Sequence, residues 1–398
     1  MKKIKLLFDT QQLDNFGSGK QTGLYRFADE VFKKLAKSDK IELYCYLDKK
    51  CKNVKKYLEL NYPNHQDKII YLPGLTKTSR DRNFLIRLKS KIHTLLLAKK
   101  YGKIVSKFDW YFSPFNPVSP IIYKNLKSSI FIHDLIPIVC NDITCSKFSA
   151  SYKKFIANIK CDFVFFNSKA TRNDFLKFRP DFAEKKTLVT LLAADAKFKP
   201  CADQALISGT CDKYQIPTAK YFLSVSDFNP RKNILFTIKN FLRFAKENSQ
   251  NDISLVLAGP NKNMNRELLA DLEFFAEFKD KIIFTGFVDD EDLPTLYSGA
   301  LAFIYTSLYE GFGLPPLEAM QSGTPTITSN TSSLPEVIGD AGILIDPTSD
   351  SELVNSLKRI CEDEPLRSDL SKKGIERSKN FSWDSLSKEL ITAWKNES

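Results

Sequence analysis

Two glutamates eight positions apart enclose a short segment rich in glycine and proline, Glu310-Gly-Phe-Gly-Leu-Pro-Pro-Leu-Glu318. Gly311 and Gly313 permit a tight turn and a close approach of the backbone to a ligand. The two prolines suit the first turn of a helix, whose free amides can hold a phosphate. We expect Glu318 to lie in that turn. Glu310 could accept hydrogen bonds from sugar hydroxyls and Glu318 from a ribose, although Glu318 could also simply stabilise the helix.

A pair of adjacent cations, Arg231-Lys232, follows the apolar run 222–225 in the segment Asn229-Pro-Arg-Lys-Asn233. Between a strand and a helix, such a pair suits a diphosphate, because both side chains and the helix amides can face one anion. A solvated basic turn is the alternative interpretation.

His133 is the best candidate among the three histidines, because it ends the apolar run 129–133, whereas His65 and His93 have polar or basic neighbours. A histidine in this position is either a core residue satisfied by one hydrogen bond or a side chain that faces a ligand. The adjacent Asp134 could orient the imidazole or face a second substrate.

The glycine-rich segment Asn15-Phe-Gly-Ser-Gly-Lys-Gln-Thr-Gly23 resembles a Walker A loop only superficially. Asp14 stands at the first glycine position of that pattern, and Gln21 stands where Ser or Thr should follow the lysine. We interpret the segment as the first loop of a domain, followed by a helix from about Leu24.

Apolar runs alternate with helical patterns along both halves of the chain, which predicts an α/β fold with parallel sheets. Strands are expected at 3–10, 40–47, 68–72, 110–115, 129–133, 163–167 and 188–192, then at 222–225, 255–258, 282–284, 302–305, 325–328 and 343–345. The loose stretch 199–219 is interpreted as a linker. Ligands of such sheets bind at the carboxyl ends of the strands, where the candidate residues lie.

The motifs together resemble those of glycosyltransferase family 4, the retaining enzymes of GT-B fold. The two glutamates match the E-x7-E motif of that family, and Phe284-Thr-Gly-Phe-Val288 and the stretches 322–329 and 333–347 fit as well. The resemblance is dense from about 221 to 347 and thinner in the first half. Pro230-Arg-Lys-Asn and His133-Asp-Leu-Ile-Pro are similar to mannosyltransferases of bacterial surface-polysaccharide assembly.

The resemblance implies two Rossmann-like domains that face each other across a cleft, at 1–200 for the acceptor and 201–380 for the nucleotide sugar. It implies that residues 381–398 form a helix that packs back toward the first domain. The expected reaction is a retaining transfer of a hexose, with mannose from GDP-mannose as the suggested donor, to a glycan or lipid-linked glycan acceptor. A sugar-nucleotide epimerase and a non-catalytic nucleotide-sugar-binding protein are the alternatives.

The resemblance also implies roles for individual residues. Lys232 neutralises the donor diphosphate, Arg231 is its weaker partner, and His133 contacts the transferred sugar. Thr22 and Gly23 approach the diphosphate and the acceptor. Many relatives have an arginine where this chain has Ser226, so Arg231 carries more of the charge or Ser226 only donates a hydrogen bond.

The remaining donor-binding residues implied by the resemblance lie on two loops. The first loop comprises Gly311, Phe312, Gly313 and Leu314. On the second, Gly286, Phe287, Val288 and Leu293 would cradle the nucleobase, largely through backbone groups. Simple core packing is the alternative for the apolar side chains of this second group.

Charge is distributed unevenly along the 398 residues. Residues 1–200 carry 39 Lys and Arg against 18 Asp and Glu, whereas residues 201–398 carry 20 against 29. The stretch 77–107 is the most basic, and its apolar residues recur at helical spacing. It is either an amphipathic helix on its own domain or a surface for an anionic membrane. No recognition motif for nucleic acid is found.

The cysteines contain no Cys-x-x-Cys pair, so neither a metal nor a cofactor besides the donor is expected. No apolar stretch approaches the length of about 18 residues needed to span a bilayer, and the N-terminus lacks the pattern of a signal peptide. We therefore expect a cytoplasmic protein, peripheral on the inner face of the cytoplasmic membrane.

Overall fold

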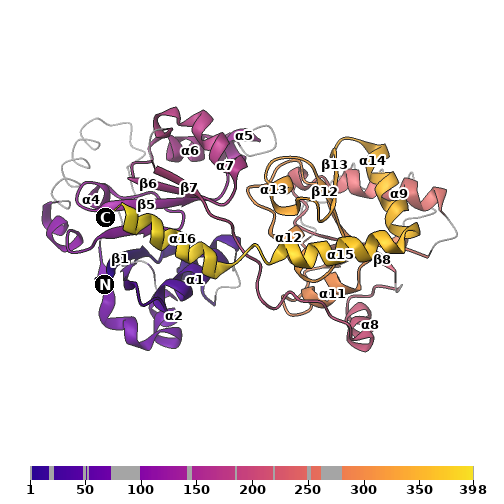
Figure 1. Ribbon diagram of the computed structural model, residues 1–398, viewed down its shortest axis with the longest axis horizontal. Coiled ribbons are helices and arrows are strands. Elements are labelled where there is room, and N and C mark those ends of the chain that lie inside the picture. The colour runs from indigo at the N-terminus through magenta and orange to yellow at the C-terminus, as the bar shows by residue number, and fades with distance from the viewer. Residues whose placement is uncertain are drawn as a thin grey trace. The chain divides into compact units, whose positions relative to one another are not determined.

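The chain folds into two compact units, each built around a parallel sheet (Figure 1). The computed structural model describes residues 2–17, 22–47, 51, 53–72, 99–140, 146–183, 186–217, 220–248, 252–260 and 280–397. The N-terminal unit comprises Met1–Val139, Ser146–Leu192 and Trp383–Ser398, and the C-terminal unit consists mainly of Ala193–Ser382. The chain passes from the N-terminal to the C-terminal unit after Leu192 and returns after Ser382.

Seven parallel strands form the N-terminal sheet in the order β3-β2-β1-β4-β5-β6-β7. They are β1 (Ile4–Asp9), β2 (Ile41–Leu47), β3 (Ile69–Tyr71), β4 (Trp110–Ser113), β5 (Lys127–Ile132), β6 (Phe163–Phe166) and β7 (Lys186–Val189). The order reverses between β1 and β4, so the carboxyl ends of these two strands flank the topological switch point, where ligands of such sheets bind.

Among the described residues, these helices belong to the N-terminal unit together with the sheet. They are α1 (Gly23–Ala36), α2 (Asn53–Asn61), α4 (Pro120–Tyr123), α5 (Ile136–Val139), α6 (Ser146–Ala157), α7 (Lys169–Phe178) and α16 (Trp383–Asn396), with short 3-10 helices η1 (Gln11–Asn15), η2 (Pro63–Lys68) and η3 (Pro180–Phe182).

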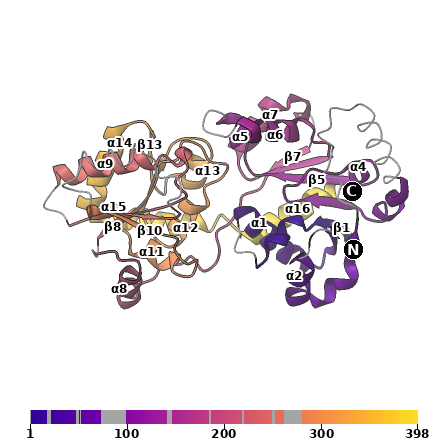
Figure 2. The ribbon, with the colours of Figure 1, turned by 180° about the vertical axis from the view of Figure 1, so that it is seen from behind.

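The last helix, α16, belongs to the N-terminal unit and runs beside α1 (Figures 1 and 2). Trp394 is fully buried, and its Nε1 donates a hydrogen bond to Ser129 Oγ at 3.0 Å. The indole of Trp110 donates to the carbonyl of Trp394 at 3.1 Å, and the ring of Phe112 packs edge-on against Trp394. The end of the chain therefore fills part of the first core.

Six parallel strands form the C-terminal sheet in the order β10-β9-β8-β11-β12-β13. They are β8 (Tyr221–Val225), β9 (Ser254–Ala258), β10 (Ile282–Gly286), β11 (Ala302–Tyr305), β12 (Thr326–Ser329) and β13 (Ile343–Ile345). The switch point of this sheet lies between β8 and β11. Both segments with candidate chemistry, Asn229–Asn233 and Glu310–Glu318, follow these two strands.

The described part of the C-terminal unit contains the helices α8 (Gln204–Lys213), α9 (Ile234–Glu247), α11 (Leu293–Gly299), α12 (Leu314–Gln321), α13 (Leu334–Ile338), α14 (Asp350–Glu362) and α15 (Glu364–Ser378). The core is formed by apolar side chains of the strands, α9 and α14, among them Phe222, Ile238, Phe241, Ile304 and Leu357.

The interpretation of 199–219 as a linker is wrong for residues 204–213, because they form α8. The carboxylate of Asp203 caps this helix by accepting hydrogen bonds from the amides of Ala205 and Leu206 at 3.0 and 3.1 Å. Only Thr210 and Cys211 of the helix are buried. An almost fully exposed helix has no apolar stripe, so the hydrophobic pattern could not reveal it.

Most of the basic stretch 77–107 lies outside the described residues. In the part of the chain that is described, every helix is too short or too polar to cross a membrane.

Truncating the indole of the last helix should destabilise the N-terminal unit. Trp394→Ala removes a fully buried aromatic side chain, and we expect a loss of about 3–5 kcal/mol in the free energy of unfolding, measured in urea. Thr392→Ala, at an exposed position of the same helix, should change it by less than about 0.5 kcal/mol. Equal stability of the two variants would show that α16 does not support the first core.

Candidate active site

Three residues predicted to be catalytic converge at the switch point of the C-terminal sheet. Oε1 of Glu310 lies 2.6 Å from Nη1 of Arg231 and 2.8 Å from Nζ of Lys232. The hydroxyl groups of Tyr305 and Ser307 donate to the same oxygen at 2.9 and 2.6 Å. One carboxylate oxygen thus collects four donors from the segments that follow β8 and end β11.

The neighbours of Glu310 in this cluster favour its ionised form. Only 8% of the residue is exposed. Burial alone would raise the pKa of its carboxyl group, but Lys232 and Arg231 outweigh that effect and lower the pKa to about 2. The ring of Tyr305 lies 4.9 Å from the Lys232 ammonium, and burial together with Glu310 holds the pKa of its hydroxyl well above the usual range. Two cations against one carboxylate leave the cluster positively charged.

Two asparagines, Asn229 and Asn233, fix the backbone turn after β8 that carries the two cations. The side chain of Asn229 accepts a hydrogen bond from the amide of Arg231 at 3.0 Å and so caps the 3-10 helix η4 (Pro230–Lys232). Asn233 has φ +57°, a left-handed conformation that asparagine tolerates better than most residues. Its side chain also donates to the carbonyl of Pro347 at 2.9 Å. The turn therefore presents Arg231 and Lys232 from a fixed backbone.

The loop that carries Glu310 requires a glycine at its end. Gly313 has φ +120° and precedes the first residue of α12, Leu314. A Cβ atom at Gly313 would lie only 2.9 Å from Cδ2 of Leu334, so a side chain there would be both strained and crowded. The adjacent Phe312 is 4% exposed and packs edge-on against Phe381. The sequence prediction of a tight turn followed by a helix holds for this segment.

Glu318 is the fifth residue of α12, so its predicted place in the first helical turn is wrong. The helix begins one residue before the prolines, and one turn spans 3.6 residues. Stabilisation by the helix N-terminus falls off within the first turn, which removes the main structural alternative for this carboxylate. Glu318 is 8% exposed, and its Oε2 accepts a hydrogen bond from the hydroxyl of Tyr297 at 3.2 Å.

Three successive hydroxyl residues after β12, which we call the hydroxyl clamp (Thr331, Ser332 and Ser333), hold the Glu310 loop. Thr331 donates to the carbonyl of Leu308 at 3.1 Å. Ser332, at φ +51°, accepts from the amide of Glu310 at 2.8 Å. The single hydroxyl proton of Ser333 is shared between the carbonyls of Glu310 and Phe312, whose oxygens lie 3.0 and 2.7 Å from Oγ.

Sequence reasoning assigned no role to the hydroxyl clamp. Its one signal was the position of three consecutive hydroxyl residues at the carboxyl edge of a predicted strand. Such a run resembles any polar loop until the facing backbone is known.

The expected nucleobase loop divides into exposed and buried parts. Gly286 has φ +69°, and its carbonyl accepts from the amide of Gly259 at 2.8 Å. Phe287 is 72% exposed, whereas Val288 and Leu293 are buried core side chains. The side chain of Phe287 is therefore open to a planar ligand, and Val288 and Leu293 can offer a ligand mainly their backbone.

Ser226 directly follows β8, next to the end of the paired strand β9. Its amide donates to the carbonyl of Ala258 at 3.0 Å. Gly259, at φ +141°, approaches the Ser226 carbonyl so closely that a Cβ atom would lie 1.9 Å from that oxygen. The backbone around Ser226 is thus fixed by a contact that only glycine permits.

His133, in the N-terminal unit, is neutral and packed among aromatic rings. Burial lowers the pKa of its imidazole to about 4, although the bond to Pro114 acts in the opposite direction. Its Nε2 lies 2.9 Å from the carbonyl oxygen of Pro114, and the rings of Phe27 and Phe131 lie within 4.7 Å of it, centre to centre. Because a carbonyl only accepts, Nε2 carries the proton and Nδ1 is the acceptor of the ring.

The other predicted residues of the N-terminal unit lie near the starts of helices. Oδ1 of Asp134 accepts from the amide of Ile136 at 3.0 Å, at the first residue of α5. Thr22 caps α1 through a hydrogen bond from the amide of Tyr25 at 3.4 Å, and Gly23 is the first residue of that helix. Thr22 and Gly23 are exposed. Residues 18–21 of the same loop lie outside the described residues.

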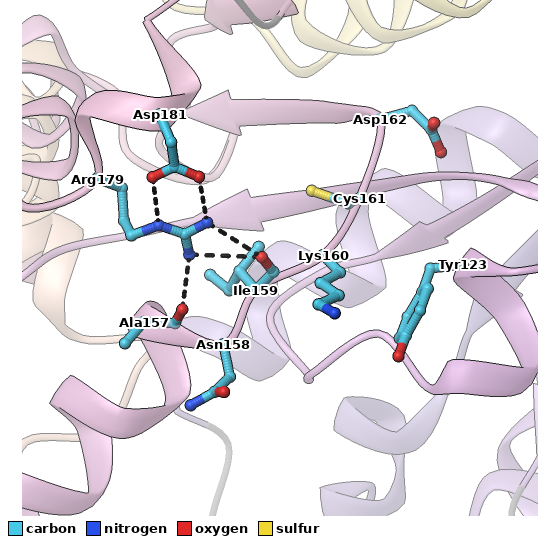
Figure 3. A pocket seen from close by; sticks show the side chains of 9 residues that line it. All are labelled: Tyr123, Ala157, Asn158, Ile159, Lys160, Cys161, Asp162, Arg179 and Asp181. Atoms are coloured by element: carbon cyan, nitrogen blue, oxygen red, sulfur yellow. Dashed lines mark hydrogen bonds and ion pairs between the residues drawn. The ribbon is translucent and has the colours of Figure 1, made fainter.

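A pocket of about 380 Å³ in the N-terminal unit contains none of the predicted site residues (Figure 3). Its lining includes Tyr123, Lys160 and Asp162, next to the amino ends of β5 and β6. Arg179 there pairs with Asp181 at 2.7 Å and donates to carbonyls at the end of α6. Its charge is therefore engaged in holding the helix, at the edge of the sheet opposite to the switch point.

The part of the chain that is described contains no group of three or more His, Cys, Asp or Glu side chains placed to hold a metal ion.

Comparison with known proteins finds a family model that covers this site. Residues 212–377, which include Arg231, Lys232, Glu310 and Glu318, match the model of glycosyl transferases group 1. Residues 212–377 are therefore similar to glycosyl transferases group 1, and this match covers less than half of the chain.

Curated relatives match over part of their length. The O-antigen chain mannosyltransferase B of Escherichia coli is 33% identical over 54% of this chain and 56% of the relative. The serotype-specific mannosyltransferase WbdA of Escherichia coli is 28% identical over 70% of this chain and 35% of the relative. The chain spans about half or less of the length of these relatives.

Solved structures match over the whole chain and share the fold. The Anabaena protein HepE in complex with UDP and glucose has a TM-score of 0.67 at 17% identity, covering 99% of this chain and 100% of HepE. The lipopolysaccharide outer core galactosyltransferase WaaB has a TM-score of 0.66 at 16% identity, with the same coverage. The predicted GT-B class, with two Rossmann-like domains, is confirmed.

Removing one hydroxyl of the clamp should loosen the Glu310 loop. Ser333→Ala removes the single hydroxyl donor that the Glu310 and Phe312 carbonyls share. We expect a loss of about 1–3 kcal/mol in stability and faster amide hydrogen exchange in residues 308–313. Ser333→Thr keeps the hydroxyl and should restore most of the protection. Ser351→Ala, at an exposed position, is the control. Unchanged exchange in the Ser333→Ala loop would contradict the clamp.

Proposed function

We propose that this chain transfers a hexose from a nucleotide sugar to a glycan or lipid-linked glycan acceptor, with GDP-mannose as donor, during assembly of a surface polysaccharide. The observation that carries the proposal is the convergence of Arg231 and Lys232 on Glu310 at the switch point of the C-terminal sheet. Phosphates bind to doubly wound sheets at this position. The names of the curated relatives support mannose as the sugar and O-antigen as the kind of product.

The donor diphosphate replaces Glu310 as the partner of the two cations. Charge-assisted hydrogen bonds from a guanidinium and an ammonium suit phosphate oxygens. The released carboxylate of Glu310 then accepts hydrogen bonds from the hydroxyl groups of the hexose. Each charged group gains a new partner in this exchange. A buried charge without a partner would cost several kcal/mol.

Glu310 positions the sugar and does not attack it. In the proposed retaining step, the bond from the anomeric carbon to the phosphate oxygen breaks while the acceptor hydroxyl forms its bond on the same face. The acceptor proton passes to an oxygen of the leaving diphosphate. Lys232 and Arg231 stabilise that leaving group without a metal, as preorganised charges.

The other predicted residues are assigned to the ends of the donor. Glu318, held by Tyr297, accepts from the ribose hydroxyls, and the exposed ring of Phe287 packs on the base. His133 is a neutral hydrogen-bond partner for the transferred sugar, since burial depresses its pKa. Thr22, Gly23 and Asp134 are assigned to the diphosphate and the acceptor.

The basic half of the chain motivates a proposed location at the inner face of the cytoplasmic membrane. Residues 1–200 carry 39 basic against 18 acidic side chains, and anionic headgroups attract such surfaces. The protein should therefore co-sediment with vesicles containing phosphatidylglycerol at low salt and be released as salt shortens the Debye length. Pure phosphatidylcholine vesicles are the control, and equal binding to both kinds of vesicle would reject the proposed location.

Removing the ammonium group should slow the chemical step. Lys232→Ala is expected to lower turnover at saturating GDP-mannose at least about tenfold, equivalent to about 1.4 kcal/mol, and EDTA should leave the wild-type rate unchanged. Lys246→Ala, at an exposed position of α9, is the matched control. Thermal shifts across a set of nucleotide sugars identify the donor, because a selective ligand stabilises the fold.

Three outcomes would contradict the proposed function. Near-normal turnover of Lys232→Ala would remove the assigned role of the cation. Donor consumption that needs no acceptor would indicate an epimerase. Donor binding without transfer or hydrolysis would indicate a binding protein.

A further inference from the structure

A second cluster of polar side chains lies at the switch point of the N-terminal sheet, and it comprises Asp9, Gln11, Gln12, Tyr111 and Asn116. Asp9 ends β1, and Gln11 and Gln12 follow in η1. Tyr111 belongs to β4, and Asn116 lies just after that strand. We call this group the Asp9 cluster.

Asp9 is the centre of the cluster and is fully buried. Its Oδ1 accepts from the amide of Gln11 at 3.0 Å. Its Oδ2 accepts from the hydroxyl of Tyr111 at 2.7 Å and from the side-chain amides of Gln11 and Asn116, both at 3.3 Å. Burial raises the pKa of this carboxyl group, and these hydrogen bonds act in the opposite direction. With its oxygens engaged and no exposed surface, Asp9 orients its neighbours and does not reach a ligand itself.

The three amide side chains form the outer part of the cluster. Gln11, Gln12 and Asn116 are each partly exposed. Nε2 of Gln12 donates to Oδ1 of Asn116 at 3.1 Å, and the side-chain nitrogens of Gln11 and Asn116 point to Asp9. Because the side-chain nitrogens of Gln11 and Gln12 donate within the cluster, their side-chain oxygens can act as hydrogen-bond acceptors for a ligand.

The two sheets place their polar clusters in corresponding positions. The Asp9 cluster bridges the ends of β1 and β4, as the Arg231, Lys232 and Glu310 cluster bridges the ends of β8 and β11. In each case these strands flank the reversal of strand order, where such sheets bind ligands. The hydrogen bonds of the Asp9 cluster among described residues include no Lys or Arg. The cluster therefore suits an uncharged ligand.

We propose that the Asp9 cluster binds the hydroxyl groups of a neutral sugar, which under the proposed function is the acceptor. The side-chain oxygens of Gln11 and Gln12 accept from the sugar hydroxyls. Asp9 is a positioning residue that orients the side chains of Gln11 and Asn116 by accepting their hydrogen bonds. Hydroxyl donors match these amide acceptors, whereas a phosphate group would bring charge to a site that has a buried carboxylate at its base.

The test measures sugar binding and transfer in the full chain. Methyl α-mannoside binding is followed by saturation-transfer NMR, and the acceptor and donor KM values are measured with GDP-mannose. We expect Gln12→Ala and Asp9→Asn to raise the acceptor KM about tenfold or more while the donor KM stays within about twofold. Gln12→Glu, which keeps the acceptor oxygens but adds charge, should retain less than full affinity and more than Gln12→Ala.

Asp109→Asn is the matched control. Asp109 also caps an end of β1, accepting from the amide of Lys5 at 2.8 Å, but at the opposite edge of the sheet. The Asp109→Asn substitution should leave the KM values for the acceptor and the donor unchanged. If Asp9→Asn fails to fold, the same KM measurements on Gln12→Ala and Tyr111→Phe still test the proposal.

The outcomes separate this proposal from the function on which it rests. Transfer by the wild type with an unchanged acceptor KM in Gln12→Ala overturns the Asp9 cluster and leaves the transferase intact. Sugar binding that is lost in Gln12→Ala, without any transfer by the wild type, supports the cluster and rejects the transferase. Absence of sugar binding by the wild type, with and without GDP, overturns the cluster.

Discussion

The buried carboxylate of Glu310 is the constraint on which the C-terminal site depends. An ionised carboxylate removed from water needs nearly complete compensation, and one oxygen of Glu310 receives it from two cations and two hydroxyls. Those donors come from different segments, so the ends of β8 and β11 are tied together by charge as well as by packing. Unusual backbone conformations at Asn233 and Ser332 accompany this arrangement. Such conformations persist only where the surrounding contacts over-determine them.

The local charge of each cluster runs opposite to the charge of its half of the chain. The acidic half, 201–398, holds the cationic pair Arg231 and Lys232, whereas the basic half, 1–200, holds a cluster built on a buried carboxylate and amides. Net charge acts at long range on encounters and surfaces. The few buried groups at the switch point, rather than the net charge, decide what a site binds. Only the structure shows which groups these are.

The sequence predicted the strands well because buried parallel strands are continuous apolar runs. The strands 302–305 and 343–345 agree with the structure to the residue. Arg231, Lys232 and Glu310 could be found because each stands in a local motif. The Asp9 cluster could not, since Asp9 and Tyr111 are 102 positions apart and meet only through strand pairing. The helix α8 was missed because it buries almost nothing.

The pairing of Glu310 with Arg231 and Lys232 also bears on which ligands the proposed enzyme retains. A nucleoside diphosphate alone would engage Lys232 and Arg231 but leave the displaced carboxylate with fewer donors in a buried place. A nucleotide sugar supplies hydroxyl groups to that carboxylate and so satisfies both halves of the exchange. After transfer, Glu310 can return to the cations and compete with the diphosphate product. The same ion pair thus favours the complete donor over the product, which a pair of cations without the carboxylate would not do.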